Sequence, residues 1–131
     1  MAEIEKTEKI TINMGPVDLG QIDLLVQEGF YSNRTDFIRT AIRTQLATHA
    51  EVVKRTVTRK TMVLGVQHYT RMDLEAIRAA GETLHINVLG LVSIAEDVSP
   101  ELALATINVI EVLGAFRASA AVKAALAGRI R

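Results

Sequence analysis

The sequence predicts an α+β protein built from two different parts. The first is a strand followed by two helices within about residues 9–46, and its strand must pair with a second chain to form an intertwined dimer. The second is a three-repeat strand–helix domain of the solenoid type with a small parallel sheet. A strict apolar–polar alternation indicates the first part. Three copies of Val-Leu-Gly, which start at residues 63, 88 and 112 and are therefore 25 and 24 residues apart, indicate the second.

The composition limits the classes to which the protein can belong. Cysteine is absent from the 131 residues, which excludes disulfides and thiolate metal sites and is typical of a reducing compartment. Fifteen basic and fifteen acidic residues cancel, whereas DNA-binding proteins usually carry a basic excess. Neither an apolar run of membrane-spanning length nor a signal peptide is present. We therefore expect a cytoplasmic protein without a membrane partner.

The strand predicted over residues 9–14 has two different faces. One carries Ile10, Ile12 and Met14, which predicts a buried dimer contact, and the other carries Lys9, Thr11 and Asn13. A lone short strand cannot satisfy its own backbone hydrogen bonds, so we expect a second copy of the chain to supply the partner strand. Such a two-stranded ribbon fits the DNA major groove, where Lys, Thr and Asn pair with base edges. The alternative is a polar face that only contacts water.

Two helices follow the strand. The first is predicted from about Val17 to Glu28, and Gly29 ends it. Either Ser32 or Asn33 caps the second, which we expect to continue to about Val53. The apolar residues of the second helix that we expect to face inward are Phe37, Ile38, Ala41, Ile42 and Leu46, with Ile38 and Ile42 in the dimer contact.

The segment from Gly29 to Arg43, Gly-Phe-Tyr-Ser-Asn-Arg-Thr-Asp-Phe-Ile-Arg-Thr-Ala-Ile-Arg, resembles the turn and second helix of the ribbon-helix-helix family of the Arc, CopG and MetJ type. The resemblance covers residues 9–46. It implies that Lys9, Thr11 and Asn13 enter the major groove from a ribbon shared by two chains. It also implies that the start of the second helix, at Ser32, Asn33 and Arg34, clamps the DNA backbone. The sequence departs from the family, in which an Arg at one of the strand positions is common, because Asn13 and the acidic Glu8 weaken the expected positive field.

The second half consists of short apolar strands, each followed by a helix signal. The strands are predicted near 61–67, 86–94 and 110–117, and a large aliphatic residue follows each glycine by twelve positions. A chance recurrence of a common tripeptide is the alternative. A three-coil stack would have two open ends, which favours association between chains. The residues expected to mediate this self-association are Val63, Leu64, Val88, Leu89, Val112, Leu113 and Phe116.

These patterns predict three regions. Residues 1–50 form the dimerisation and DNA-binding domain, residues 51–60 form a basic linker or helix extension, and residues 61–131 form the self-association domain. The basic region includes Lys54 and Arg55, followed by Arg59 and Lys60. It is either a solvated connector or a source of phosphate contacts, which would add salt-dependent affinity without sequence information.

No constellation of residues predicts an enzyme. The phosphate-binding glycine motifs are absent, and His49, His68 and His85 lie apart without neighbouring ligands, so we expect no metal and no cofactor. The leading hypothesis is a dimeric, sequence-specific DNA-binding protein, a transcriptional regulator with a C-terminal oligomerisation domain. The expected partners are duplex DNA and the chain itself. One alternative is a polymer-forming scaffold that uses the ribbon only to dimerise. Another is an antitoxin whose C-terminal part binds a partner enzyme.

Overall fold

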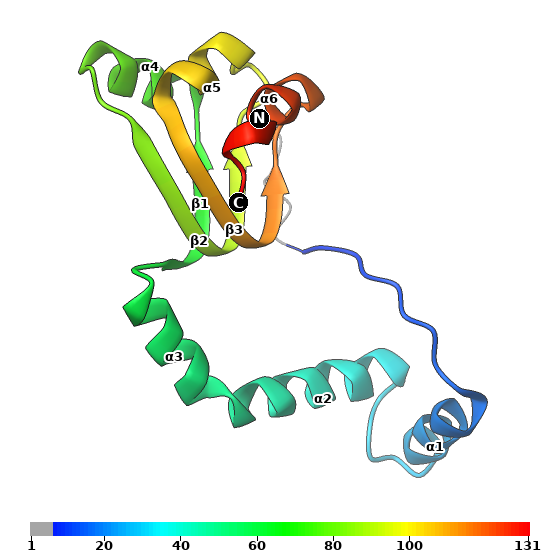
Figure 1. The fold of residues 1–131 in the computed structure, drawn as a ribbon. Helices are drawn as coiled ribbons and strands as arrows, with labels where there is room; N and C mark the ends of the chain where they lie inside the picture. The colour runs from blue at the N-terminus through cyan, green and yellow to red at the C-terminus, as the bar shows by residue number, and fades with distance from the viewer. Residues whose placement is uncertain (1–6) are drawn as a thin grey trace. The chain divides into compact units, whose positions relative to one another are not determined.

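A computed structural model describes residues 7–131 of the chain (Figure 1). Its elements are α1 (Pro16–Gln27), α2 (Arg34–Thr48), α3 (Ala50–Arg59), β1 (Val63–Tyr69), α4 (Arg71–Ala79), β2 (Leu84–Ile94), α5 (Pro100–Thr106), β3 (Ile107–Arg117), α6 (Ala120–Ala125) and the short 3-10 helix η1 (Ala127–Arg129). They divide between two compact units. The N-terminal unit spans residues 9–56, and the C-terminal unit spans residues 57–131 together with Thr7 and Glu8. The first six residues of the predicted 1–50 domain lie outside the described part of the chain.

The C-terminal unit contains a parallel sheet with strand order β1-β2-β3, which confirms the predicted three-stranded parallel sheet in an α+β protein. The three Val-Leu-Gly copies lie side by side in this sheet. Val63 pairs with Val88, which pairs with Val112, and the leucines and glycines that follow keep the same register. The 25- and 24-residue spacing therefore corresponds to one step across the sheet. The observed strands begin and end within three residues of the predicted ones.

A row of glycines crosses the sheet where the strands approach one another most closely. Gly90 and Gly114 have φ angles of 143° and 126°, a region that side chains rarely adopt. A Cβ atom on Gly90 would lie 2.0 Å from the carbonyl oxygen of Gly65, and one on Gly114 would lie 2.0 Å from that of Gly90. β2 and β3 each bend between their ends (Figure 1). Only glycine fits at Gly90 and Gly114, because a Cβ atom at either position would overlap the neighbouring backbone.

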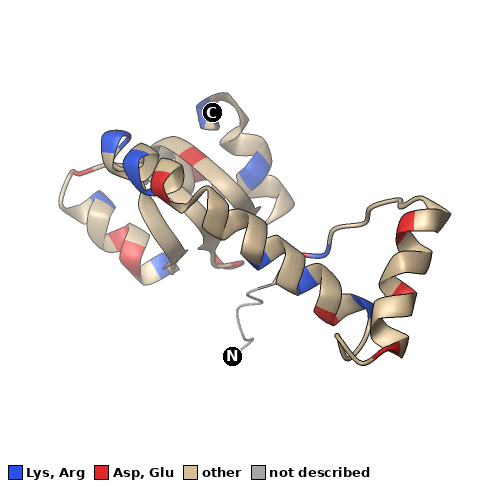
Figure 2. Ribbon diagram, turned by 90° about the horizontal axis from the view of Figure 1, so that it is seen from below, with Lys and Arg blue, Asp and Glu red and all other residues tan. Residues whose placement is uncertain are grey.

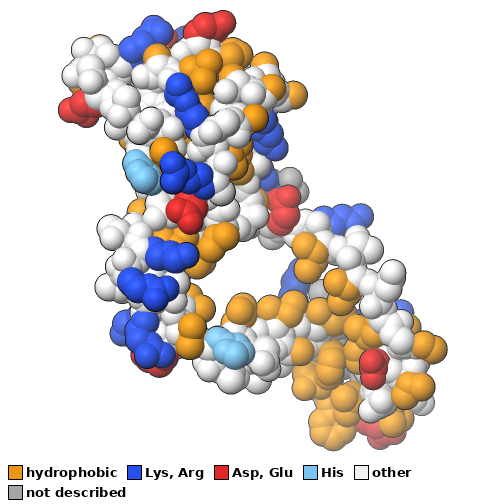
Figure 3. All heavy atoms as spheres, in the orientation of Figure 1, with side chains coloured by type: hydrophobic (Ala, Val, Ile, Leu, Met, Phe, Trp, Pro, Cys, Tyr) orange, Lys and Arg blue, Asp and Glu red, His pale blue; other side chains and the backbone are white. Residues whose placement is uncertain are grey.

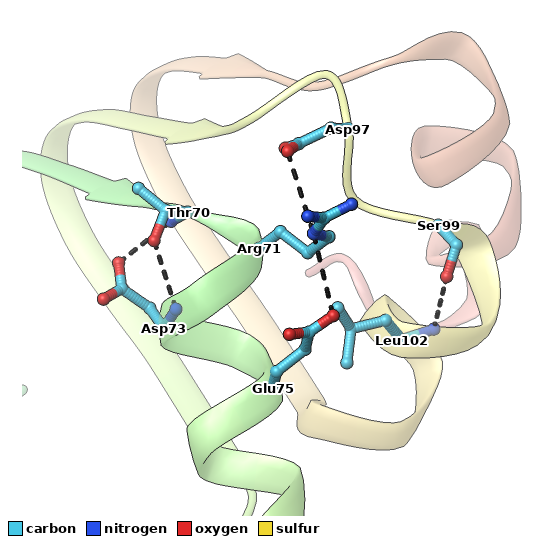
Figure 4. A network of polar contacts seen from close by, with 7 residues as sticks. All are labelled: Thr70, Arg71, Asp73, Glu75, Asp97, Ser99 and Leu102. Atoms are coloured by element: carbon cyan, nitrogen blue, oxygen red, sulfur yellow. Dashed lines mark hydrogen bonds and ion pairs between the residues drawn. The ribbon is translucent and has the colours of Figure 1, made fainter.

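Each strand leads into a short capped helix. The side chains of Thr70, Ser99 and Ser119 accept hydrogen bonds from backbone N–H groups at the starts of α4, α5 and α6. Figure 4 shows the first two caps. It also shows Arg71 at the start of α4, whose Nε lies 3.7 Å from Glu75 and 3.9 Å from Asp97. Because Asp97 precedes α5, this cation bridges two neighbouring strand–helix segments.

The helices and the sheet enclose one aliphatic core. β2 contributes four fully or nearly fully buried residues, and α4, α5 and α6 each contribute a fully or nearly fully buried side chain. The core consists of Leu74, Ile86, Val88, Val92, Ile94, Val98, Leu102, Ala103, Ile107, Ile110, Val122 and Leu126. Leu102 and Leu126 are two of the aliphatic residues that the sequence places twelve positions after a glycine. The third, Ile77, packs against this core from α4.

The C-terminal end of the chain corrects the prediction of two open ends. Ile130 forms a parallel bridge with Ile110, and the Arg131 backbone N–H donates to the Ile110 carbonyl at 2.8 Å. Nη1 of Arg129 donates to the carbonyl oxygens of Leu104 (2.5 Å) and Ile107 (2.7 Å). The chain end therefore occupies the outer edge of β3 around Ile110. Among the described residues, none pairs with the outer edge of β1.

The residues predicted to mediate self-association fall into two groups. Val88 is fully buried in the core, and Val112 and Phe116 pack against that core. The Val88 side chain is therefore covered within its own unit, whereas those of Val112 and Phe116 stay partly exposed, and self-association through these residues stays a prediction. Consecutive apolar residues in a strand point to opposite faces, so the pattern could not distinguish core from surface. Val63, Leu64 and Leu113 are exposed, and Leu89 is partly exposed.

Candidate nucleic-acid interface

The predicted ribbon segment is extended but unpaired in the single chain. Residues 7–15 carry no strand assignment and run as an open segment (Figure 1), so the strand that is predicted over 9–14 with a second chain as its partner does not form within one chain. The segment stays unpaired because strand hydrogen bonds need a partner strand, and the described residues supply none. Ile10 is 75% exposed and Ile12 is 64% exposed, although both stand on the apolar side of the alternation.

The polar side of the same segment is also fully accessible. Lys9, Thr11 and Asn13 are exposed, and they present an ammonium, a hydroxyl and an amide, all of which can donate hydrogen bonds. Thr7 and Glu8 directly precede Lys9 in the sequence. Nη2 of Arg117, at the end of β3, donates to the Thr7 carbonyl and to the Glu8 carboxylate, both at 2.6 Å. Arg117 thus neutralises the acidic residue beside Lys9. The sequence analysis missed this contact, because 109 positions separate its partners and no local pattern links them.

The turn between α1 and α2 is fixed by reciprocal capping. The Asn33 side chain accepts a hydrogen bond from the Asp36 backbone N–H at 2.8 Å, which settles the alternative between Ser32 and Asn33. In return, the Ser32 backbone N–H donates to the Asp36 carboxylate at 2.9 Å. The rings of Tyr31 and Phe37 meet edge to face with their centroids 5.0 Å apart. The start of α2 is therefore held by its own residues.

Arg34, a predicted clamp on the DNA backbone, already has a carboxylate partner. Its Nε and Nη2 donate to the two carboxylate oxygens of Asp23 on α1, each at 2.8 Å. This hydrogen bonding lowers the pKa of the Asp23 carboxyl and raises that of Arg34. This bidentate ion pair joins α1 to α2. The sequence analysis treated each helix separately and did not identify this role.

The predicted continuous second helix is interrupted. α2 ends at Thr48, His49 caps it, and α3 begins at Ala50, so the prediction of one helix to about Val53 is corrected. The Nε2 atom of His49 lies 3.4 Å from the Gln45 side chain. Within the described part of the chain, no group of three His, Asp or Glu residues is placed to hold a metal ion.

Charge is unevenly distributed over the three helices of the N-terminal half (Figure 2). α1 carries Asp18 and Asp23 and no basic residue. α2 carries three arginines against one aspartate, and the basic residues of α3 are Lys54, Arg55 and Arg59. The cations of α3 follow one side of that helix in Figure 3. Within residues 16–59, α1 is therefore acidic, whereas α2 and α3 each carry a basic excess.

The apolar surface of the N-terminal unit is largely uncovered. Of its large apolar residues, only Ile22 is fully buried. Figure 3 shows apolar side chains gathered over α1 and α2 on the face in view. Ile38, predicted for the dimer contact, is partly exposed, whereas Met14 and Ile42 are exposed. The exposed large apolar residues of the unit are Ile10, Ile12, Met14, Val17, Leu24, Phe30, Ile42, Leu46 and Val52.

Comparison with known proteins extends the resemblance beyond the first two helices. A search of curated proteins and a search of solved structures each found no match. No helix among residues 7–131 is long and apolar enough to cross a membrane. Residues 5–123 match the ribbon-helix-helix transcriptional regulator family, so the match includes most of the C-terminal unit. The chain therefore belongs to the ribbon-helix-helix transcriptional regulator family.

Proposed function

We propose that this protein is a dimeric, sequence-specific DNA-binding regulator whose C-terminal unit holds copies of the chain together. One observation supports the proposal most strongly. The N-terminal unit, residues 9–56, buries a single large apolar residue and exposes nine others. A unit of this size with so small a core cannot offset the conformational entropy lost on folding. A second copy is the partner that would cover these residues.

If two extended segments paired, the apolar face of residues 9–14 could be buried while the polar face stayed accessible. Antiparallel pairing of residues 9–14 would bury Ile10, Ile12 and Met14 against the exposed apolar residues of α2, among them Ile42. The opposite side of the ribbon would then carry Lys9, Thr11 and Asn13 from each chain. These donors suit the acceptor atoms that base pairs present in the major groove.

The remaining predicted DNA contacts would hold the phosphate backbone. At the start of α2, Ser32 and Asn33 use their backbone and side-chain groups in the cap, and Arg34 is engaged by Asp23. We infer that this region positions the ribbon chiefly through the free N–H groups of the helix end. Lys54 and Arg55 on α3 would add salt-dependent attraction to phosphates.

The double substitution Lys9→Ala with Thr11→Ala tests the reading of DNA by the ribbon. We expect the dimer to persist, because both side chains stand on the polar face of the segment. Affinity for a selected duplex should fall by about 10- to 100-fold, since each good base contact contributes about 1–3 kcal/mol of discrimination. Fluorescence anisotropy across salt concentrations measures this loss, and light scattering measures the dimer.

A matched control is the variant Lys54→Ala with Arg55→Ala. It should weaken binding to all duplexes by a similar factor and make the salt dependence shallower, because phosphate contacts carry no sequence information. If the substitution of Lys9 and Thr11 left affinity and sequence preference unchanged, the ribbon would not be the reading element.

A scaffold function is the second candidate, and the exposed edge of β1 favours it. In that case the ribbon would serve only to pair chains, and assembly would continue through the C-terminal unit. An antitoxin whose C-terminal part orders only on binding an enzyme is less well supported, because that unit has its own core of twelve buried residues. Assembly that grows with concentration and is unaffected by loss of Lys9 and Thr11 would support the scaffold.

A further inference from the structure

The C-terminal unit has one closed end and one open end. At the closed end, the last residues of the chain bind the outer edge of β3 through the Ile130–Ile110 bridge and the two hydrogen bonds of Arg129. At the open end, β1 pairs with β2 on one side only. Its other edge presents backbone N–H and C=O groups that no described residue meets.

Side-chain burial reflects the same asymmetry. Val63 and Val88 occupy the same register position, yet Val63 on β1 is 45% exposed and Val88 on β2 is fully buried. Leu64 and Val66 on β1 and Met72 at the start of α4 are also exposed. Stacked strand–helix units need a polar cap at each end to stay soluble. The first unit of this stack ends instead in an apolar layer.

β1 also lacks the features with which proteins usually block a free edge. Its sequence, Val-Leu-Gly-Val-Gln-His-Tyr, contains no Lys, Arg, Asp, Glu or Pro. The charges lie beyond its ends: Arg59 and Lys60 precede the strand, and Arg71, Asp73 and Glu75 follow it. Two β1 strands could therefore approach one another without like charges meeting between them.

We propose that the open edge of β1 binds the β1 edge of a second copy of this chain, in an antiparallel pair that joins two three-stranded sheets. This inference rests on the proposed function, in which dimerisation through the ribbon already keeps a second copy nearby and raises its effective concentration. Head-to-tail stacking needs an open β3 edge, which the C-terminal residues occupy around Ile110. Like-to-like pairing of β1 avoids the edge that the C-terminal residues partly cover, and a two-fold pair closes on itself.

Charge complementarity favours the antiparallel arrangement. When two β1 strands run in opposite directions, the basic end of each chain at Arg59 and Lys60 lies near Asp73, Glu75 and Asp97 of the other, where Arg71 offsets only one of the three negative charges. A parallel arrangement would bring the two basic ends together and the two acidic ends together, which costs free energy. The pair would also cover Val63, Leu64 and Val66 with an equivalent apolar surface.

Amide hydrogen exchange on the full-length protein tests the pairing. We compare the wild type with Leu64→Lys on β1 and with the control Leu113→Lys on β3. The two leucines share one register row through Leu89, and both are exposed. Lys on an edge strand opposes pairing. We expect the β1 amides that do not pair with β2 to be protected in the wild type and to exchange at least about tenfold faster in Leu64→Lys. Leu113→Lys should leave them protected.

The exchange of residues 9–14 separates this inference from the proposed function. If residues 9–14 are protected but the outer β1 amides exchange equally fast in the wild type and in Leu64→Lys, the edge pairing is overturned and the ribbon dimer stands. If residues 9–14 exchange freely, the proposed ribbon dimer is overturned. The pairing of β1 edges is then tested only by the protection of the outer β1 amides.

A second measurement covers the possibility that Leu64→Lys does not fold. The chain has no cysteine, so Leu64→Cys and Leu113→Cys each introduce a single thiol. A short bismaleimide should link two chains through residue 64 at least about tenfold faster than through residue 113, because the pair brings the two copies of residue 64 together. Equal rates at the two positions would overturn the proposal.

Discussion

The two units of this protein achieve stability in opposite ways. The C-terminal unit, residues 57–131 with Thr7 and Glu8, surrounds twelve buried residues with helices and a sheet. The N-terminal unit, residues 9–56, buries Ile22 alone among its large apolar side chains. One unit can fold by covering its own apolar surface, and the other requires a surface from elsewhere. Under the proposed function, the N-terminal unit of a second chain supplies that surface.

Among the predictions, a substitution in the glycine row should destabilise the C-terminal unit most. Gly90→Ala would place a Cβ atom 2.0 Å from the Gly65 carbonyl oxygen, in a backbone conformation that alanine rarely adopts. We expect a loss of about 4 kcal/mol or more in the free energy of unfolding of the C-terminal unit. Chemical denaturation followed by circular dichroism measures it.

Gly65→Ala is the matched control for that substitution. Gly65 has a φ of 140°, but a Cβ atom there would meet nothing within 4 Å. Only the backbone strain remains, so the expected loss is about 1–3 kcal/mol. Equal losses at the two glycines would mean that close approach of the strands does not require glycine at Gly90.

Breaking the ribbon tests the opposite property of the N-terminal unit. Ile12→Asp would put a carboxylate on the apolar face of residues 9–14, with an expected cost to the dimer of about 3 kcal/mol. The helices α1 and α2 should melt at lower temperature, and their melting should lose its dependence on protein concentration. The C-terminal unit should keep its stability. Circular dichroism at two concentrations, with Lys9→Ala/Thr11→Ala as control, would detect the difference.

The sequence predicts those features of the fold that depend on patterns within a short segment or a regular repeat. The Val-Leu-Gly spacing predicted which strand residues align, and the alternation at 9–14 predicted a segment that cannot pair within its own chain. Which of the consecutive apolar residues face the core was not predictable, because Val88 and Leu89 are equally apolar and differ only in what covers them. The break at His49 has no Gly or Pro to mark it.

The contacts made by three arginines show the same limit at the candidate site. Arg34 binds Asp23 across a turn, Arg117 binds Glu8 across most of the chain, and Arg129 binds the carbonyl groups of Leu104 and Ile107, which lie 25 and 22 positions away. A sequence read locally assigns such cations to solvent or to DNA. Only the fold identifies their partners, and it leaves Lys9, Thr11 and Asn13 as exposed candidates for base contacts.

Loss of the hydrogen bonds that hold the end of the chain beside β3 would show how much this contact stabilises the C-terminal unit. Arg129→Ala deletes hydrogen bonds from a charged group to the carbonyls of Leu104 and Ile107, so we expect a loss of about 1–2 kcal/mol. The outer edge of β3 should exchange its amide hydrogens faster, while the N-terminal unit is unchanged. Arg131→Ala is the control, because only its backbone N–H reaches Ile110. Equal stability of Arg129→Ala and the wild type would show that the chain end does not hold this edge.

The smallest expected effect concerns pH and the cap of α4. The pKa of Asp73 is lowered from 3.8, first by the hydrogen bond from the Thr70 backbone N–H and then by the Thr70 hydroxyl. A carboxyl whose folded pKa lies below its unfolded value stabilises the fold above about pH 4, and that contribution is lost as pH falls through the folded pKa. Asp73→Asn should therefore lower stability at pH 6 but change it little near pH 2. Denaturation midpoints at both pH values measure this, and Thr70→Ala should reproduce the loss at pH 6. Because both residues belong to the C-terminal unit, the melting of α1 and α2 should stay the same, and a shift there at pH 6 would mean that the two units do not unfold independently.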